Sequence, residues 1–413
     1  MNQELEPTAK PLLKPRLEYF LVDTDLKLKQ LLAVLKKNSS PIAIDAERAS
    51  GFRYGQKVYL IQIAIKGQAI YLIDPIANLD SNLLDELKSS INSFTWIIHA
   101  ATQDLECLNE FGLVPKKLFD TELAGRLLGL PKVSLGTMCE SLLGLSLAKE
   151  HSAVDWSSRP LPEEWLNYAA LDVDVLDELW LKVKVELEKA NKHYLAIEEF
   201  EFLTLPTTRT PKLERWRSTT GVHEIKDARQ LTIVKWMWEA REELAKQKDV
   251  APSRLIPDLS IIAAVKAMPK SKSELAELRS FSGRASRTYI DTWWDSFQKG
   301  SLTHDLVELR PKAIGIPHHR NWPNKFPEAN LRLTWAKKLL QELSLNTSIP
   351  VENLLTPDIL KSICFEPNGF DRTEISSDLE QRGARKWQID LVSPILAEAF
   401  SKTDLPESEE TKN

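Results

Sequence analysis

Residues 41–47 join a short apolar run to two acids, Asp45 and Glu47. The run favours a buried β-strand, and side chains two positions apart on a strand point to the same face. Holding two charged carboxylates close together and away from water costs on the order of several kcal/mol. A chain with this feature is therefore constrained to a fold in which a metal ion or another cation compensates the pair.

Further acids occur in two later segments. Residues 96–105 predict a short apolar strand followed by a helix with Asp104 in its first turn. Tyr168 and Asp172 stand four positions apart, which places them on one face of a helix. Each pattern alone has a plainer interpretation, namely a strand end that enters a solvated turn and a pair on a helix surface. Together, in this order, they predict one site made of Asp45, Glu47, Asp104, Tyr168 and Asp172.

Residues 44–47, 99–105 and 168–173 resemble the three exonuclease motifs of the DEDD superfamily, in its tyrosine subclass. More narrowly, about the first half of the chain resembles the ribonuclease D family. Supporting stretches are residues 60–63, 119–121 and 155–161. The resemblance implies an α/β ribonuclease H-like 3′-5′ exonuclease domain with a mixed sheet.

The chemistry of phosphodiester hydrolysis explains these residue types. Two hard divalent cations about 4 Å apart can activate a water and stabilise charge on the phosphoryl and leaving oxygens. Such cations, Mg²⁺ or Mn²⁺, take carboxylate oxygens. The resemblance implies that Asp45 bridges both ions, that Glu47 and Asp172 complete the site of the ion that activates water, and that Asp104 holds the second. Tyr168 would orient the attacking water, because a phenol with a pKa of about 10 is a poor base near neutrality.

Length and composition agree with a multidomain enzyme. A chain of 413 residues predicts roughly two to four domains. Its three cysteines are scattered without pattern, which favours a reducing cytoplasm over a disulfide framework. The acidic N-terminus lacks an apolar core and no apolar run is long enough to span a membrane, so we expect neither a signal peptide nor a membrane anchor. A net charge of -5 means that any basic surface for nucleic acid must be regional.

Residues 17–205 alternate apolar strands with helical patterns, as in an α/β domain. The predicted strands lie at 42–45, 58–65, 69–73 and 96–99, and the predicted helices at 104–111, 121–128 and 135–143. A polar segment interrupted by prolines follows, and we assign residues 206–222 to a linker. Lys212, Arg215 and Arg217 surround Trp216 there, and contact with a nucleic-acid backbone and a solvated helix start are equally good interpretations.

The second half contains a faint internal repeat. Residues 254–262 resemble residues 353–360, and residues 283–291 resemble residues 383–390. The period is too long for a solenoid and favours duplication of a helical domain. Residues 223–305 resemble an HRDC domain, the module shared by ribonuclease D and RecQ-type helicases, and residues 325–403 resemble a divergent copy. We therefore expect two small all-α HRDC-type domains after the exonuclease domain.

Seven residues outside the acid set are predicted substrate contacts: Gln62, His99, Lys149, Trp156, Arg159, Arg284 and Arg287. Trp156 precedes the last motif and is expected to contact a terminal nucleotide. Lys149 and Arg159 flank it, and both are expected to lie near phosphates. Arg284 and Arg287, and more weakly Arg385 in the second copy, follow a glycine and are expected to meet phosphate rather than solvent alone. A structural role competes with substrate contact for His99.

The resemblance implies a cytoplasmic, monomeric, metal-dependent 3′-5′ exoribonuclease that releases nucleoside 5′-monophosphates. Its expected substrates are the 3′ trailers of transfer RNA precursors and other small structured RNAs. Two alternatives stay open. A 3′-5′ DNA exonuclease is possible because nothing in these motifs reads the 2′-hydroxyl. The second alternative, a non-catalytic RNA-binding scaffold, is disfavoured by the complete acid set.

Overall fold

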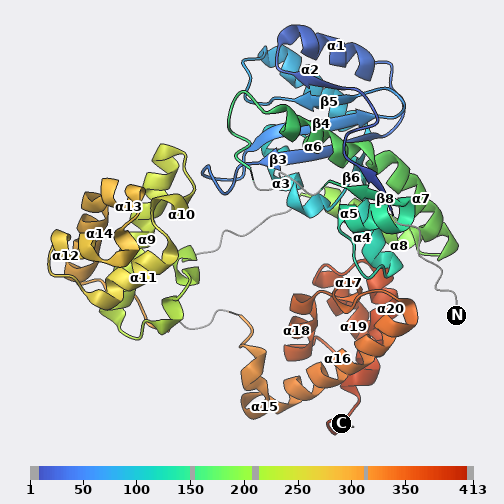
Figure 1. The fold of residues 1–413 in the computed structure, drawn as a ribbon. Coiled ribbons are helices and arrows are strands. Elements are labelled where there is room, and N and C mark those ends of the chain that lie inside the picture. The colour runs from blue at the N-terminus through green and yellow to red at the C-terminus, as the bar shows by residue number, and fades with distance from the viewer. Residues whose placement is uncertain (1–8, 149–153, 207–213, 311–314, 407–413) are drawn as a thin grey trace, which may run out of the picture.

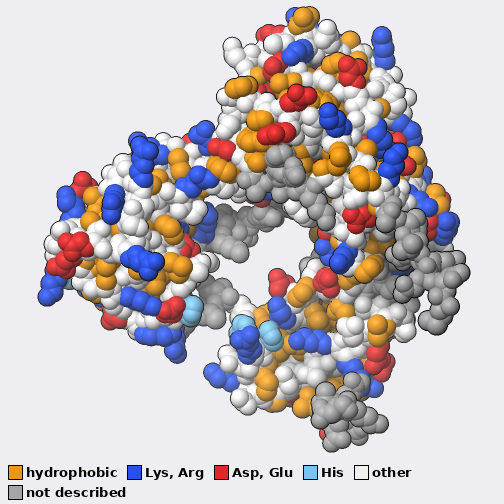
Figure 2. Space-filling view, viewed as in Figure 1, with side chains coloured by type: hydrophobic (Ala, Val, Ile, Leu, Met, Phe, Trp, Pro, Cys, Tyr) orange, Lys and Arg blue, Asp and Glu red, His pale blue; other side chains and the backbone are white. Residues whose placement is uncertain are grey.

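The computed structural model describes residues 9–148, 154–206, 214–310 and 315–406. In this part of the chain an α/β domain comes first, and two all-helical modules follow it (Figure 1). The three parts lie around a central opening (Figure 2). The predicted fold class, an α/β domain with a mixed sheet followed by small helical domains, is confirmed.

Six strands of the described residues form one sheet in the order β2-β5-β4-β3-β6-β7. Strand β4 pairs antiparallel with β3 and β5, and the remaining neighbours are parallel, so the sheet is mixed. The strands are β2 (Tyr19–Val22), β3 (Ile42–Arg48), β4 (Val58–Ile65), β5 (Ile70–Ile73), β6 (Thr95–Ile98) and β7 (Lys117–Asp120). A separate parallel pair joins β1 (Lys10–Leu12) to β8 (Leu145–Leu147).

Helices cover both faces of the sheet, so that every residue of the central strand β4 is buried. On one face, Ile42 of β3 shares a core with α1 (Asp25–Leu35), α2 (Ser81–Ser93) and α7 (Leu176–Lys189). On the other face, Ala43 of β3 shares a core with Ala169 of α6 (Glu163–Asp174). Because successive strand residues alternate, Asp45 and Glu47 belong to the face that α6 covers.

The predicted elements agree with the structure best where the pattern is long. The predictions for residues 58–65 and 121–128 match β4 and α4 (Thr121–Leu128). Strand β3 runs beyond its predicted end and carries both acids within it. The helix predicted over residues 135–143 is instead α5 (Leu135–Met138) followed by a π-helical turn, Cys139–Leu143. Strands β2 and β7, of four residues each, were not predicted.

The first helical module consists of α9 (Ala228–Lys248), α10 (Pro252–Leu255), α11 (Asp258–Ala267), α12 (Lys272–Glu277), α13 (Arg284–Thr288) and α14 (Ile290–Leu302). Helices α9 and α14 pack closely at Gly300, where a Cβ atom would lie only 2.7 Å from the Cα of Ile233. Short 3-10 turns occur at Arg215–Ser218, Val222–Glu224 and Arg279–Phe281. No helix of the described residues is long and apolar enough to cross a membrane.

The second helical module consists of α15 (Trp322–Lys325), α16 (Pro327–Thr347), α17 (Val351–Leu354), α18 (Pro357–Phe365), α19 (Arg372–Gln381) and α20 (Lys386–Phe400), after a 3-10 turn at His319–Asn321. Helices α9 and α16 each have 21 residues. Each ends at a residue with a left-handed backbone, Asp249 (φ 49°) or Ser348 (φ 53°), and a four-residue helix follows. This shared layout supports the predicted internal duplication.

Both helical modules contact the α/β domain. The second packs on α8 (His193–Thr204), where Arg385 binds Glu199 through Nε at 2.6 Å and Nη2 at 2.8 Å. The first contacts the loop between β3 and β4, where Arg254 Nε donates to the Gly51 carbonyl oxygen at 2.7 Å. This loop begins one residue after β3, so the first module lies against the segment that follows the acid pair.

Candidate active site

Strand β3 presents the first two acids to the face that α6 covers. Asp45 lies opposite Gln62 and Glu47 opposite Leu60 in the antiparallel β3–β4 pairing. Both carboxylates are only half-buried, whereas Leu60 and Gln62 have no exposed surface. The Asp45 carboxylate accepts a hydrogen bond of 2.9 Å from the Ala46 N–H. The acids therefore point from a fully buried sheet toward a place that solvent reaches.

Helix α6 supplies Tyr168 and Asp172, one turn apart as predicted. Ala169 and Val173 pack into the core against the sheet, while Tyr168 and Asp172 remain half-buried. The phenol of Tyr168 donates a hydrogen bond to the Asp172 carboxylate. Packing of the small and β-branched residues of α6 thus brings this pair against the acid-bearing face of β3.

Asp104 comes from a turn between β6 and α3 (Leu105–Phe111), after a 3-10 turn at Ala101–Gln103. We predicted it in the first turn of the helix, but it is the residue that precedes the helix. Aspartate at this position usually caps its own helix, yet the Asp104 side chain makes no capping hydrogen bond. The side chain instead lies within electrostatic reach of Asp45 and 3.6 Å from Nη2 of Arg48, so the carboxyl group is directed into the site.

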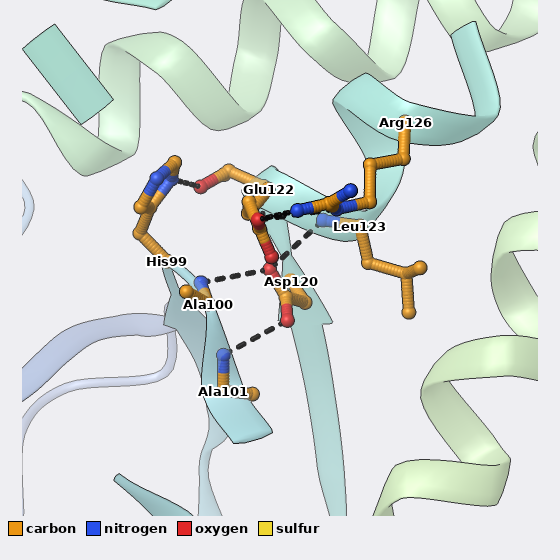
Figure 3. Close-up of polar contacts among 8 residues, drawn as sticks. His99, Ala100, Ala101, Asp120, Glu122, Leu123 and Arg126 are labelled. Carbon is orange, nitrogen blue, oxygen red and sulfur yellow. Dashed lines mark hydrogen bonds and ion pairs between the residues drawn. The ribbon is translucent and has the colours of Figure 1, made fainter. Parts of the chain in front are cut away.

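Asp120 holds the turn at Ala100 and Ala101 (Figure 3), which leads to Asp104. Its carboxylate accepts hydrogen bonds from the Ala100 N–H at 3.0 Å and the Ala101 N–H at 2.9 Å. It also accepts from Glu122 and Leu123, and so caps α4 at the same time. Ala100 has a left-handed backbone (φ 60°), which a residue with a Cβ adopts only when its surroundings hold it there. The buried Asp120 carboxylate therefore holds both the turn that follows β6 and the start of α4.

The acids of the site bind protons more tightly than isolated carboxylates do. Burial raises the pKa of Asp45 to about 6. Burial and repulsion by Asp45 raise the pKa of Asp104 to about 8. Burial raises the pKa values of Glu47 and Asp172 as well, and for both the nearby Asp45 adds to the effect. Burial is the main cause of this pattern, and repulsion among the carboxylates adds to it for Glu47, Asp104 and Asp172.

Burial also raises the pKa of Tyr168, and its acidic neighbours add to the shift. The phenol therefore keeps its proton near neutral pH and acts as a hydrogen-bond donor. This agrees with the sequence-based expectation that Tyr168 orients a group rather than removes a proton.

Arg48 is a basic residue of the site that the sequence analysis did not single out. Its Nη2 lies 3.6 Å from Oδ1 of Asp104, and its Nη1 donates to Oε1 of Gln56 at 3.1 Å. The guanidinium charge lowers the pKa values of Asp45, Glu47 and Asp104. The sequence signal that could have identified Arg48 is a basic residue directly after the two paired acids.

The donor chemistry of the site fits hard divalent cations. Its carboxylates come from three elements, and clusters of such oxygens are the ligands that Mg²⁺ and Mn²⁺ prefer. In the present conformation, however, no three acidic, histidine or cysteine groups of the described residues converge on one point that could hold an ion. Asp104 faces Asp45 and Arg48 instead.

Three predicted substrate contacts are buried or fully engaged within the protein in this structure, and substrate contact by them stays a prediction. Trp156 has no exposed surface and packs edge to face with Trp165 in the core, 5.6 Å between ring centroids. Arg159 uses all its N–H groups on Asp74 and on backbone carbonyls, so none is left for phosphate. Gln62 is fully buried beside Asp45, and its amide has no hydrogen-bond partner among the described residues.

Other predicted contacts have different outcomes. His99 is held by Thr121, with 2.8 Å between Nδ1 and Oγ1, and burial lowers its pKa to about 4, so its ring is neutral. Lys149 lies outside the described residues. Arg284 and Arg287 are exposed on α13 of the first module. Substrate contact by His99 and by these two arginines stays a prediction.

Two basic segments are used for packing instead. The guanidinium of Arg385, which was expected to meet phosphate, binds Glu199 between the second module and α8, and its contact with phosphate stays a prediction. Trp387, in the same segment, is buried. Within the segment assigned to a linker, Arg217 stacks on the buried Trp216 at 4.2 Å and pairs with Glu214 at 2.8 Å.

Comparison with protein families gives three matches along the chain. Residues 19–188 match the 3′-5′ exonuclease family, and residues 230–296 match the HRDC domain. Residues 315–400 match a family described as the 3′ to 5′ exonuclease C-terminal domain. The α/β part is therefore a 3′-5′ exonuclease domain, and the first helical module contains an HRDC domain.

Relatives and solved structures agree with these matches. Ribonuclease D of Bartonella henselae is 32% identical over 297 residues, which cover 71% of this chain and 68% of the relative. Ribonuclease D of Shewanella sp. (strain ANA-3) is 30% identical over 315 residues, which cover 72% and 78%. A crystal structure of a protein from Bifidobacterium adolescentis is 34% identical, with a TM-score of 0.84 over 95% of this chain and 100% of that one. Escherichia coli RNase D shares the fold, with a TM-score of 0.65 at 24% identity over 92% of this chain and 98% of that one. The chain belongs to the ribonuclease D family.

Proposed function

We propose that this chain, a 3′-5′ exoribonuclease by its family, binds two divalent cations at the acid site and removes nucleotides singly from RNA 3′ ends. One observation carries the proposal: three separate elements bring Asp45, Glu47, Asp104 and Asp172 within electrostatic reach of one another. Such a set of oxygen donors suits Mg²⁺ or Mn²⁺. The products would be nucleoside 5′-monophosphates.

Each acid has a distinct role in this proposal. Divalent cations at such a site lower the pKa of a bound water and stabilise charge on the phosphoryl and leaving oxygens. Asp45, between the other acids, would hold both cations. Glu47 and Asp172 would hold the one beside the attacking water, and Asp104 the other. The oxygen of the protonated Tyr168 phenol, whose O–H is donated to Asp172, would accept a hydrogen bond from the attacking water and so orient it.

RNA is the proposed substrate because the curated relatives are ribonucleases D, and the Escherichia coli structure is described as an exoribonuclease involved in structured RNA processing. A groove of about 1410 Å³ supports a path for the strand. It is lined by Ser50 and Gln56 of the β3–β4 loop, by Glu106 of α3, and by Trp238 and Pro252 of the first module. We propose the 3′ ends of transfer RNA precursors as substrates, and a monomeric enzyme in the cytoplasm.

The test compares degradation of a 3′-extended transfer RNA and a single-stranded DNA of matched 3′ sequence. Each substrate is offered with Mg²⁺, with Mn²⁺ and with chelator. We expect cation-dependent shortening of the RNA by single nucleotides, and a loss of more than about a hundredfold in rate for Asp45→Asn. Glu163→Gln, which removes an equal charge from an exposed position at the start of α6, is the matched control.

The outcomes separate the alternatives. Faster shortening of the DNA would favour a DNA exonuclease, since the acid site itself does not distinguish the two sugars. Binding of RNA without shortening, equal in the wild type and in Asp45→Asn, would favour a non-catalytic scaffold. Equal activity of Asp45→Asn and Glu163→Gln would overturn the assignment of the acid site.

A further inference from the structure

Arg48 occupies an unusual position for a cation in a site built from acids. A register shift separates Glu47 from Arg48 in the β3–β4 pairing, and such bulges commonly re-aim a side chain at the end of a strand. The Arg48 guanidinium reaches Asp104, which is 6% exposed and belongs to another element. The contact at 3.6 Å is longer than a close ion pair, so it is an electrostatic contact without the geometry of a tight clamp.

Gln56 gives the guanidinium a second anchor outside the acid site. Its Oε1 accepts hydrogen bonds from Arg48 Nη1 at 3.1 Å and from the Ser50 hydroxyl at 2.9 Å. The Arg48 side chain keeps 30% of its surface exposed, and Gln56 lines the groove beside the first module. Arg48 can therefore lose its contact with Asp104 and still keep a partner at the solvent side.

A divalent cation and Arg48 compete for the same carboxylate. With Asp104 among the ligands of a cation, as in the proposed function, a guanidinium at its present position would place like charges next to each other. Removing Arg48 would leave four carboxylates without this compensation, which favours any other cation that enters. The bulge, the exposed path and the Gln56 anchor all permit the arginine to move aside.

We propose that Arg48 is a built-in counter-ion of the acid site, which shares Asp104 with the divalent cation and turns toward Gln56 when that cation binds. This inference rests on the proposed function, because it concerns the same cation. Arg48 acts through Asp104, and it is therefore a positioning residue. It sets the cation affinity of the site to a lower value than the acids alone would give.

The test measures Mn²⁺ binding by titration calorimetry at pH 8 for the wild type, Arg48→Gln, Arg48→Lys and Lys57→Gln. Arg48→Gln should bind Mn²⁺ about tenfold more tightly, because one positive charge next to a ligand is gone. Arg48→Lys should stay near the wild type. Lys57 is exposed in the same loop, and Lys57→Gln removes an equal charge, so its Kd should change by less than about twofold.

Thermal unfolding gives a second readout that does not depend on activity. With chelator, Arg48→Gln should have a lower Tm than the wild type, and saturating Mn²⁺ should raise its Tm by a larger amount. Unchanged or weaker Mn²⁺ binding in Arg48→Gln, with normal binding in the wild type, would overturn the inference and leave the proposed function intact. Absence of Mn²⁺ binding in the wild type, as in Asp45→Asn, would overturn both.

Discussion

At the scale of single residues, the acids of the candidate active site differ from surface acids in their affinity for protons. The pKa of Asp45 is raised to about 6 and that of Asp104 to about 8, mainly by burial. A carboxylate whose pKa is higher in the folded than in the unfolded chain stabilises the fold below its unfolded pKa of about 4. That contribution is lost as the pH rises through the folded pKa.

The sign of this effect leads to a prediction for Asp104→Asn, whose neutral amide does not titrate. In chelator, the Tm of the wild type relative to Asp104→Asn should fall between pH 5 and pH 9, because the Asp104 charge appears beside Asp45. Saturating Mn²⁺ at pH 9 should reverse the fall in the wild type. A difference in Tm that stays constant with pH in differential scanning fluorimetry would contradict the raised pKa.

A second residue-scale prediction concerns Asp120. One of its oxygens, Oδ1, accepts from Ala100, Glu122 and Leu123, and the other from Ala101 alone. Asp120→Asn can keep the three hydrogen bonds at Oδ1 and loses the one from Ala101. This loss should cost about 1 kcal/mol of unfolding free energy. Asp120→Ala leaves four N–H groups without this acceptor and should cost about 3 kcal/mol or more. Urea denaturation measures both, and equal losses would show that the hydrogen bonds at Oδ1 do not matter.

Sequence patterns placed the acids on shared faces, whereas they could not tell which of the predicted substrate contacts lie in the core. Spacing alone placed Tyr168 and Asp172 on one helix face, and strand alternation placed Asp45 beside Glu47. Whether Trp156 faces a nucleotide or the core depends on α6 and its Trp165, which lie elsewhere in the fold. A local pattern carries no information on such partners, so it did not predict that Trp156 is buried.

At the scale of elements, the segment between β3 and β4 connects the acid pair with the first helical module. The Arg254 guanidinium lies 3.9 Å from the centre of the Phe52 ring, and it also bonds the Gly51 carbonyl. Arg53 extends the contact, since its Nη1 lies 3.6 Å from Asp249 of the module and its Nε donates to Ser157 Oγ at 2.7 Å. Short loops of this kind leave no periodic signal, so this contact was not predictable from the sequence.

We predict that Arg254→Ala loosens this loop without unfolding the protein. The lost ring contact and hydrogen bond amount to about 1 to 2 kcal/mol, so amide hydrogen exchange in residues 49–56 should accelerate about tenfold. Lys246→Ala, at an exposed position near the end of α9, is the control. Exchange that stays the same in both variants would mean that the loop is held by its own domain.

At the scale of the whole molecule, the two helical modules have similar layouts and different attachments. The first presents Arg284 and Arg287 to solvent, whereas the corresponding basic segment of the second packs against α8 through Arg385. The sequence repeat predicted the shared layout, because helix lengths and turn residues are local properties. It could not predict the different attachments, because Glu199 lies almost two hundred residues from Arg385 along the chain, in another domain.

The Arg385–Glu199 pair should therefore stabilise the attachment of the second module. Glu199 is 5% exposed, and it also accepts a hydrogen bond of 2.9 Å from Trp387 Nε1. Arg385→Met would leave a buried carboxylate without its cation, which should cost about 3 kcal/mol of unfolding free energy. Adding Glu199→Gln removes the buried charge and keeps an acceptor for Trp387, so most of the loss should return. Urea denaturation checks this against Arg372→Met, an exposed arginine of the same module. If Arg385→Met and Arg372→Met were equally stable, apolar packing alone would hold the module, and Arg385 would again be a candidate for phosphate contact.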